Sequence, residues 1–337
     1  MTPSTLAPEL LRRLVARASR APSAHNTQPA RWRFAGARAE LHEDTTRWLR
    51  VGDPARRDQQ LALGAAWEGL ALALSEEGLA LAEPALGERL GTPPEASLQL
   101  VAAATLGGRR AVDPLAAYTA ARRSYRGGFR AATAAESAAL RALLANRDDV
   151  AVVAGEADLR ALATQYDDAA VHCLREPGFA AELYRWMRFS ARDPGWDRDG
   201  LTAACLGLSA VEAWGARFAL RPGPLALLRA ARLDGLLVAE AAKVASATAV
   251  VLLQRRRDES LFAAGRALYR RWLELERAGF AAVPMSALLD SPRHRDALLA
   301  RHPPPAGAEL VMVLRVGPKP ETPPPASARL PVDELLV

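Results

Sequence analysis

Two long segments of this chain resemble each other in a way that suggests an internal repeat. Arg56 begins RRDQQLALGAAWEGLALALSEEGLALAEP, and Arg256 begins RRDESLFAAGRALYRRWLELERAGFAAVP. Each holds a glycine among small residues, Gly64 or Gly265, and apolar positions at helical spacing. An alanine-rich chain can produce such a match by chance. A degenerate repeat would instead give two related halves across a pseudo-two-fold axis, with the small residues letting the two helices approach closely.

Apolar spacing elsewhere predicts a mixture of helices and strands. Helices are expected at 5–19, 134–145 and 157–174, and the repeat segments are expected to be helical from Asp53-Pro54 and over 258–278. Strands are expected around Trp32 and Phe34, which alternate with arginines, and at 39–41, 97–104, 150–154, 247–253 and 310–317. The stretch 176–236 predicts short helices and loops. It is interpreted either as a lid over a site or as plain packing at a domain edge.

Charge and composition narrow the classes of function. The 337 residues carry a formal net charge of +6, and the basic side chains are almost all arginine. Because the arginines are scattered, we expect no nucleic-acid partner, although a few could bind an anionic small molecule. No uncharged apolar run reaches the ~18 residues of a membrane span, so a cytoplasmic protein without a membrane partner is expected. Cys173 and Cys205 lack metal or redox spacing and are expected to be buried apolar residues, and no metal site is predicted.

The stretch APSAHNTQPARWRF, 21–34, places many hydrogen-bonding groups on a stiff loop after the first expected helix. The amides of Asn26 and Gln28 can both donate and accept hydrogen bonds. Such residues could simply close the helix and make a turn. The alternative is that the loop binds a flat ligand edged with donors and acceptors. His25 lies in the loop, but nothing in the sequence assigns it acid–base work.

Three motifs resemble the FMN-dependent nitroreductase superfamily. APSAHNTQP resembles the loop that packs against the flavin, ARRSYRGGF resembles the phosphate-binding segment, and SARLPVDELL, 327–336, resembles the C-terminal basic segment. The loop comes first here and the RRS segment about a hundred residues later. That order is similar to the Acg-like branch, in which two halves are fused and one flavin site survives. The family usually has tryptophan where Ala30 follows the QP pair, a departure that concerns the ring environment.

The resemblance implies an α+β fold. In it, a nitroreductase-like three-layer α/β/α arrangement is built from two fused halves that form a pseudo-dimer with central antiparallel sheets. Residues 1–110 would be the first half and would carry the flavin-packing loop. Residues 111–337 would be the second half and would carry the phosphate-binding segment, a lid insertion at 176–236 and a C-terminal extension at 317–337.

The resemblance also implies a set of FMN contacts. Arginine forks match phosphate oxygens, and a cation at the N1/O2 edge of the ring stabilises the anionic reduced flavin. The expected phosphate contacts are Arg122, Arg123, Ser124 and Arg329, and the cation at the ring edge is Arg126. The other expected contacts are Pro22, Ser23, Ala24, Asn26, Gln28, Pro284, Met285 and Ser327. No catalytic side chain is expected because the flavin itself carries the chemistry.

Three functions follow from the resemblance. The first is an FMN-dependent oxidoreductase that takes hydride from NADH or NADPH and reduces a nitroaromatic, quinone or similar acceptor. The second is a storage or sequestration protein in which a lid shuts the flavin from nicotinamide. The third is a flavin-free pseudoenzyme. The fused pseudo-dimer would be complete as a monomer, but a homodimer formed through other faces stays open.

Overall fold

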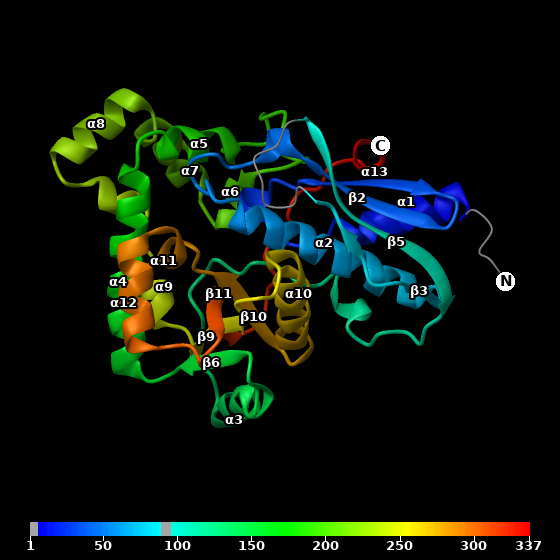
Figure 1. Ribbon diagram of the computed structural model, residues 1–337. Helices are drawn as coiled ribbons and strands as arrows, with labels where there is room; N and C mark the ends of the chain where they lie inside the picture. The colour runs from blue at the N-terminus through cyan, green and yellow to red at the C-terminus, as the bar shows by residue number, and fades with distance from the viewer. Residues whose placement is uncertain (1–5, 89–95) are drawn as a thin grey trace.

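The computed structural model describes residues 6–88 and 96–337, which form two antiparallel sheets (Figure 1). The first sheet has the order β1-β2-β5-β3, with β4 also paired to β5, and the second has the order β10-β11-β9-β6. The strands of the first sheet are β1 (Ala30–Ala35), β2 (Arg38–Asp44), β3 (Leu79–Leu81), β4 (Ala85–Leu86) and β5 (Leu98–Arg109). Those of the second are β6 (Val150–Val153), β9 (Ala249–Arg256), β10 (Phe280–Pro284) and β11 (Ala308–Pro318). The α+β class with antiparallel sheets is confirmed.

Helices pack against both sheets. They are α1 (Pro8–Ala18), α2 (Arg57–Glu76), α3 (Ala134–Leu144), α4 (Glu156–Arg175), α5 (Phe179–Trp186), α6 (Ala203–Leu206), α7 (Ala210–Ala219), α8 (Pro222–Ala230), α9 (Ala241–Ala245), α10 (Leu261–Arg277), α11 (Ala287–Asp290), α12 (Pro292–Arg301) and α13 (Val332–Leu335). A short parallel pair, β7 (Met187–Arg188) and β8 (Leu201–Thr202), lies between α5 and α6. No helix in the described ranges has the length and apolar character needed to cross a bilayer. Cys173 and Cys205 are free and buried, as expected.

The second sheet is covered by helices on both faces. Side chains alternate along a strand, so neighbouring residues of β9 enter different cores. Val251 and Leu253 pack with α10 and α3, whereas Val250 and Leu252 pack with α4, α9, α11 and α12. β9 is therefore a nearly continuous apolar run, as its sequence predicts. This half of the molecule has the expected α/β/α layers.

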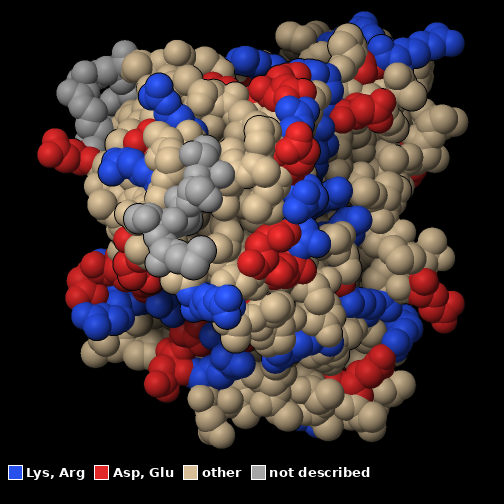
Figure 2. Space-filling view, turned by 90° about the vertical axis from the view of Figure 1, so that its right-hand side faces the viewer, with Lys and Arg blue, Asp and Glu red and all other residues tan. Residues whose placement is uncertain are grey.

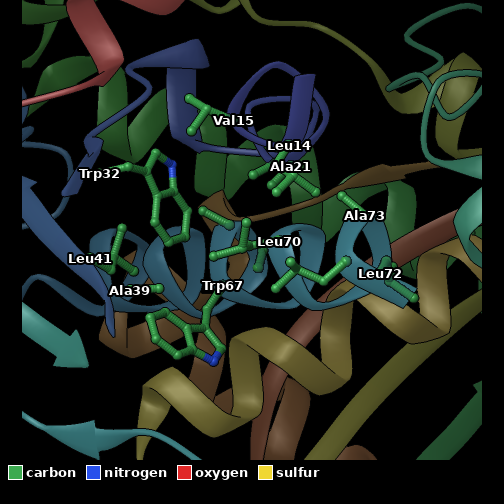
Figure 3. Close-up of a cluster of buried hydrophobic side chains, with 14 of the residues drawn as sticks. Leu14, Val15, Ala21, Trp32, Ala39, Leu41, Trp67, Leu70, Leu72 and Ala73 are labelled. Carbon is green, nitrogen blue, oxygen red and sulfur yellow. The ribbon is translucent and has the colours of Figure 1, made fainter. Parts of the chain in front are cut away.

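The first sheet packs one face against α1 and α2. Trp32 of β1 is buried there, and Figure 3 shows its ring above Trp67 of α2, with ring centroids 6.0 Å apart. The simple alternation predicted for β1 is only partly correct. Arg31 is also buried, because its guanidinium pairs with Asp44 at 2.7 Å. The chain end returns to this sheet, where the Val337 N–H donates to the Trp32 carbonyl at 2.9 Å.

α2 and α10, the two helices of the proposed repeat, lie side by side between the sheets (Figure 1). Their backbones approach closely at two glycines. A Cβ added to Gly64 would overlap the carbonyl oxygen of Phe262, and one added to Gly265 would overlap that of Leu61. The contact is reciprocal, because each glycine lies three residues after the residue that the other glycine touches. The predicted close approach of the repeat helices is confirmed, and the pseudo-two-fold relation of two fused halves stays a prediction.

The start of α2 differs from the prediction. The helix begins at Arg57 rather than at Asp53-Pro54, because Arg56 takes a left-handed conformation with φ 57°. The side chain of Arg56 pairs with the buried Glu43, which holds the loop away from the helical path. Asp53 still contributes a cap, since its carboxylate accepts the Gln59 N–H at 2.8 Å. The expected left-handed stop at Gly78 is confirmed, with φ 71°.

The stretch 176–236 folds into short helices, as predicted. Leu220 and Leu225 join Leu174, Ala180 and Met187 in a small apolar core of their own. In Figure 1, α5, α7 and α8 lie at the opposite end of the molecule from β3. On the other side of the molecule, seen in Figure 2, basic and acidic side chains are interspersed. The division of the chain at residue 110 and the lid role of this stretch stay predictions.

Replacing Gly64 by alanine should destabilise the protein strongly. The new methyl group meets backbone, which cannot move aside as a flexible side chain does. The free energy of unfolding, measured by urea denaturation, should fall by about 2–4 kcal/mol. Gly215, inside α7, is the matched control because nothing lies within 4 Å of its added Cβ. Gly215→Ala should be neutral or stabilise by about 0.5–1 kcal/mol. Similar losses for both variants would contradict the close crossing.

Candidate functional site

The loop after α1 has an unusual backbone conformation. His25, Asn26 and Gln28 have φ values of 46°, 55° and 51°, in the left-handed region that side-chain-bearing residues seldom adopt. The first two belong to the 3-10 turn η1 (Ala24–Asn26). The Ser23 hydroxyl oxygen accepts the Gln28 N–H at 3.0 Å and closes the loop. Each such residue costs on the order of 1–3 kcal/mol, so the surrounding contacts must hold the loop in place.

The two amide side chains of the loop supply those contacts. Asn26 donates from Nδ2 to the carbonyls of Ala328 (3.0 Å) and Gly200 (3.3 Å). Gln28 donates from Nε2 to the Arg198 carbonyl at 2.8 Å and accepts the Leu330 N–H at 2.9 Å. The amides therefore join the loop to the chain end and to the 198–200 segment. These bonds explain the polar residues of the loop in structural terms, and direct flavin contacts by the two amides stay a prediction.

Arg122 and Arg329 meet beside this loop, although they are more than two hundred residues apart in sequence. Arg329 donates to the Ser19 and Arg20 carbonyls at the end of α1 and to Asn26 Oδ1 at 3.0 Å. Arg122 donates to the same Arg20 carbonyl at 3.1 Å. Burial, followed by Arg122 and Arg20, lowers the pKa of Arg329 to about 9. Burial also lowers the pKa of Arg123, with a further contribution from Arg20.

Four arginines thus form one group, the arginine cluster: Arg20, Arg122, Arg123 and Arg329. The sequence motifs identified all of them except Arg20, whose only signal is its position directly before the loop. Within the described ranges, Glu276 is the carboxylate that acts on Arg122 and Arg123 by raising their pKa, and it is already paired with Lys319 at 2.6 Å. The positive charge of the cluster is therefore left largely uncompensated.

Several buried polar atoms beside the cluster lack well-aligned hydrogen bonds. In the described part of the chain, Nε and Nη1 of Arg122 find no such partner, and neither do the Tyr269 hydroxyl and the Trp272 Nε1. The Arg122 guanidinium lies over the Trp272 ring, 4.5 Å from its centroid. Buried donors and unpaired cations are costly, so native proteins rarely leave them without a partner. A multiply charged anion at this position would accept hydrogen bonds from these donors and would compensate the charge of the arginines.

A second cation, Arg126, lies between the loop and the second sheet. Tyr125, next to it, donates its N–H to the Ala282 carbonyl of β10 at 3.2 Å, and Ser124 forms a β-bridge with the same residue. Arg126 acts electrostatically on His25 of the loop. Burial first, and then Arg126, lowers the pKa of His25 to about 4, so the imidazole is neutral at pH 7. The Nδ1 atom of His25 is buried and has no hydrogen-bond partner among the residues that the structure describes.

The other predicted contacts are placed less directly. Pro22 and Ser23 line a cavity of about 20 Å³ beneath the loop, which has room for about one water molecule and not for a flavin ring. Ala24 and Ser327 are half-buried. Pro284 ends β10, while Met285 is buried and donates its N–H to the Val313 carbonyl at 2.8 Å. The Met285 N–H is thus already used by the sheet.

Replacing His25 by glutamine should make the protein less sensitive to acid. The folded-state pKa is about 4 and the ordinary value is 6.5. Between these values only the unfolded chain takes up the proton, so the wild type should lose roughly 2 kcal/mol of stability as pH falls through this window. His25→Gln lacks this titration, and its unfolding free energy in urea should fall less. His172→Gln, at an exposed position, is the control. Equal acid losses in His25→Gln and wild type would contradict a buried neutral imidazole.

No family model and no curated protein match this sequence. Among solved structures, the chain is similar to the FMN-dependent nitroreductase NfnB from Mycobacterium smegmatis in complex with NADPH, with 20% identity, 61% of this chain and 87% of that chain covered, and a TM-score of 0.32. It is also similar to oxidized iodotyrosine deiodinase bound to FMN and 3-iodo-L-tyrosine, with 15% identity, coverage of 64% and 94%, and a TM-score of 0.33.

A third similarity is to NfnB from sphigopyxis sp. strain HMH, with 20% identity, coverage of 66% and 97%, and a TM-score of 0.35. At these identities and TM-scores, a functional assignment depends on the geometry of the site itself.

Proposed function

We propose that this protein binds FMN and acts as an oxidoreductase of the nitroreductase superfamily. It would pass hydride or electrons from NADH or NADPH through the flavin to a nitroaromatic, quinone or similar acceptor. The observation that carries the proposal is the convergence of Arg122, Arg123 and Arg329, three of the four residues predicted to hold the phosphate. The donors beside them that lack well-aligned hydrogen bonds within 6–88 and 96–337 are available to an anion.

The residues at the site fit the chemistry of FMN. Its phosphate is a dianion, which the arginine forks of the cluster match, and the neighbouring Ser124 adds a hydroxyl donor. Arg126 supplies a cation for the pyrimidine edge of the ring, and neutral His25 can offer a hydrogen bond without adding charge. Bound FMN would supply the hydride and electron transfer. The protein side chains bind and orient it, and none of them is required as an acid or nucleophile.

Membership of the Acg-like branch is part of the proposal. It is supported by the order of the motifs and by the reciprocal glycine contacts of α2 and α10. Under this proposal, 1–110 and 111–337 are two fused halves with one flavin site between them. NADH or NADPH and a small acceptor would be the partners, and the protein would function in the cytoplasm as a monomer or a homodimer.

A second function, flavin storage, is favoured by contacts between the loop and the 176–236 stretch. Gln28 bonds to the Arg198 carbonyl, Asn26 bonds to the Gly200 carbonyl, and Arg47 pairs with Asp199 at 2.9 Å. These contacts would hold the insertion against the flavin-packing loop. If the insertion covers the ring, nicotinamide would be excluded and the protein would retain FMN with little turnover.

Arg123→Gln tests the phosphate site. Because charge-assisted hydrogen bonds contribute about 1.5–3 kcal/mol, FMN affinity should fall roughly 10- to 100-fold. Riboflavin lacks the phosphate, so its affinity should change little. Both are measured by fluorescence quenching. Arg147→Gln is the control, because Arg147 is also half-buried but already faces Glu274 at 3.2 Å.

The same variant separates a binding role from a structural one. Arg123→Gln removes repulsion within the cluster, so the flavin-free protein should melt at the same or a higher temperature. Parallel losses of riboflavin affinity, FMN affinity and melting temperature would contradict the phosphate role.

Anaerobic addition of NADPH to the FMN-loaded protein distinguishes the two functions. Bleaching of the flavin absorbance within seconds would support the oxidoreductase, since the lid must then admit nicotinamide. Bound flavin that stays oxidised would support storage. Protein that binds neither FMN nor riboflavin would contradict both and leave the pseudoenzyme.

A further inference from the structure

An unusual number of large apolar side chains are exposed between residues 211 and 236. Val211, Trp214 and Leu227 expose 79%, 71% and 73% of their surface. The full set, called the hairpin surface below, is Val211, Trp214, Phe218, Leu227, Leu233 and Leu236. These residues belong to α7, α8 and the turn that follows, at the end of the molecule away from both sheets (Figure 1). Six exposed large apolar side chains within one short stretch of the chain indicate an interaction surface.

The exposed side chains of α7 follow helical spacing. Val211, Trp214 and Phe218 lie at positions i, i+3 and i+7, which places them on one face. The Trp214 and Phe218 rings stack with centroids 6.2 Å apart and planes inclined by 10°. Ala213 points the other way and is buried. α7 thus has apolar side chains on two faces, and in the described part of the chain the face with Val211, Trp214 and Phe218 is left exposed.

Three exposed arginines lie in the same stretch of chain as the hairpin surface. Arg217, Arg221 and Arg232 are exposed, and none forms an ion pair with the residues that the structure describes. The one acidic residue between 207 and 233 is Glu212, whose carboxylate already accepts hydrogen bonds from the Ser209 N–H and hydroxyl. Apolar and aromatic groups bordered by free arginines match a lipid surface with acidic headgroups.

We propose that the hairpin surface binds an anionic membrane surface, with Trp214, Phe218 and Leu227 entering the interface and the arginines contacting the headgroups. A second copy of the chain fits less well. A two-fold contact would bring the same unpaired arginines of two copies together, and like charges across an interface are unfavourable. The proposal does not depend on FMN binding.

Binding to a membrane surface differs from the expectation that the protein has no membrane partner. The absence of a membrane partner was expected because no segment can span a bilayer. A hairpin that lies on the surface needs no spanning segment, since its apolar side chains enter only the boundary between headgroups and acyl chains.

Vesicle flotation tests the proposal with the full chain. The protein should float with vesicles of equal parts phosphatidylcholine and phosphatidylglycerol, and much less with phosphatidylcholine alone. Trp214→Ser combined with Phe218→Ser should weaken binding roughly tenfold or more. Arg217→Gln combined with Arg221→Gln should weaken it and reduce its dependence on salt. Val112→Ser, at a position that is 60% exposed and outside the hairpin, is the control and should bind as the wild type does.

Three results would overturn the proposal. The first is no flotation with the acidic vesicles, and the second is equal flotation of the double-serine variant with unchanged melting temperature. The third is a dimer, seen by light scattering, that the double-serine variant abolishes and that binds no vesicles. That third result would assign the surface to another copy of the chain.

Discussion

The close crossing of α2 and α10 is the constraint on which the rest of the structure depends. Phe262, Tyr269 and Leu273 of α10 enter the core of the first sheet, and Leu61 of α2 enters the core of the second. Gly64 and Gly265 allow each helix to reach the core of the other sheet, because any side chain at these positions would overlap the backbone of the other helix. The two sheets are thereby fixed against each other. The first loop, the RRS segment and the chain end then meet at one place.

At that place the protein keeps interactions that stability alone does not favour. The loop has three left-handed non-glycine residues. Among the residues that the structure describes, no carboxylate forms an ion pair with the arginine cluster, and Arg122 retains buried donors without well-aligned hydrogen bonds. The carbonyls at the end of α1 compensate part of the charge, since that end of a helix is the negative end of its dipole. The free-energy cost that remains, from backbone strain and uncompensated charge, is expected at a position where a ligand completes the site.

Much of the fold was accessible from local patterns. The helices of the repeat, the buried β9 and the stop at Gly78 follow from periodicity and from glycine conformation. The start of α2 could not be predicted from the sequence, because it depends on Arg56 pairing with Glu43 of β2. The same limit applies to Arg31, whose burial depends on Asp44 across the first sheet. Ion pairs between distant segments leave no local signal.

The sequence motifs predicted which residues belong to the candidate site, but not how these residues are arranged in space. The motifs named Arg122 and Arg329, but Arg20 joins them only because the end of α1 packs beside the chain end. The sequence shows that Asn26 can form hydrogen bonds, yet its partners Gly200 and Ala328 lie 174 and 302 residues away along the chain. For Met285, sheet register assigns its N–H to Val313, and register is a property of the assembled sheet.

A crystal structure of the protein grown with FMN tests the central claim most directly. The account predicts a phosphate group within hydrogen-bonding distance of Arg122 and Arg329, with at least one bond to the Nε or Nη1 atom of Arg122. The isoalloxazine ring should lie between the His25 loop and Arg126. FMN bound elsewhere, or bound with its phosphate in solvent and the arginine cluster unchanged, would contradict it.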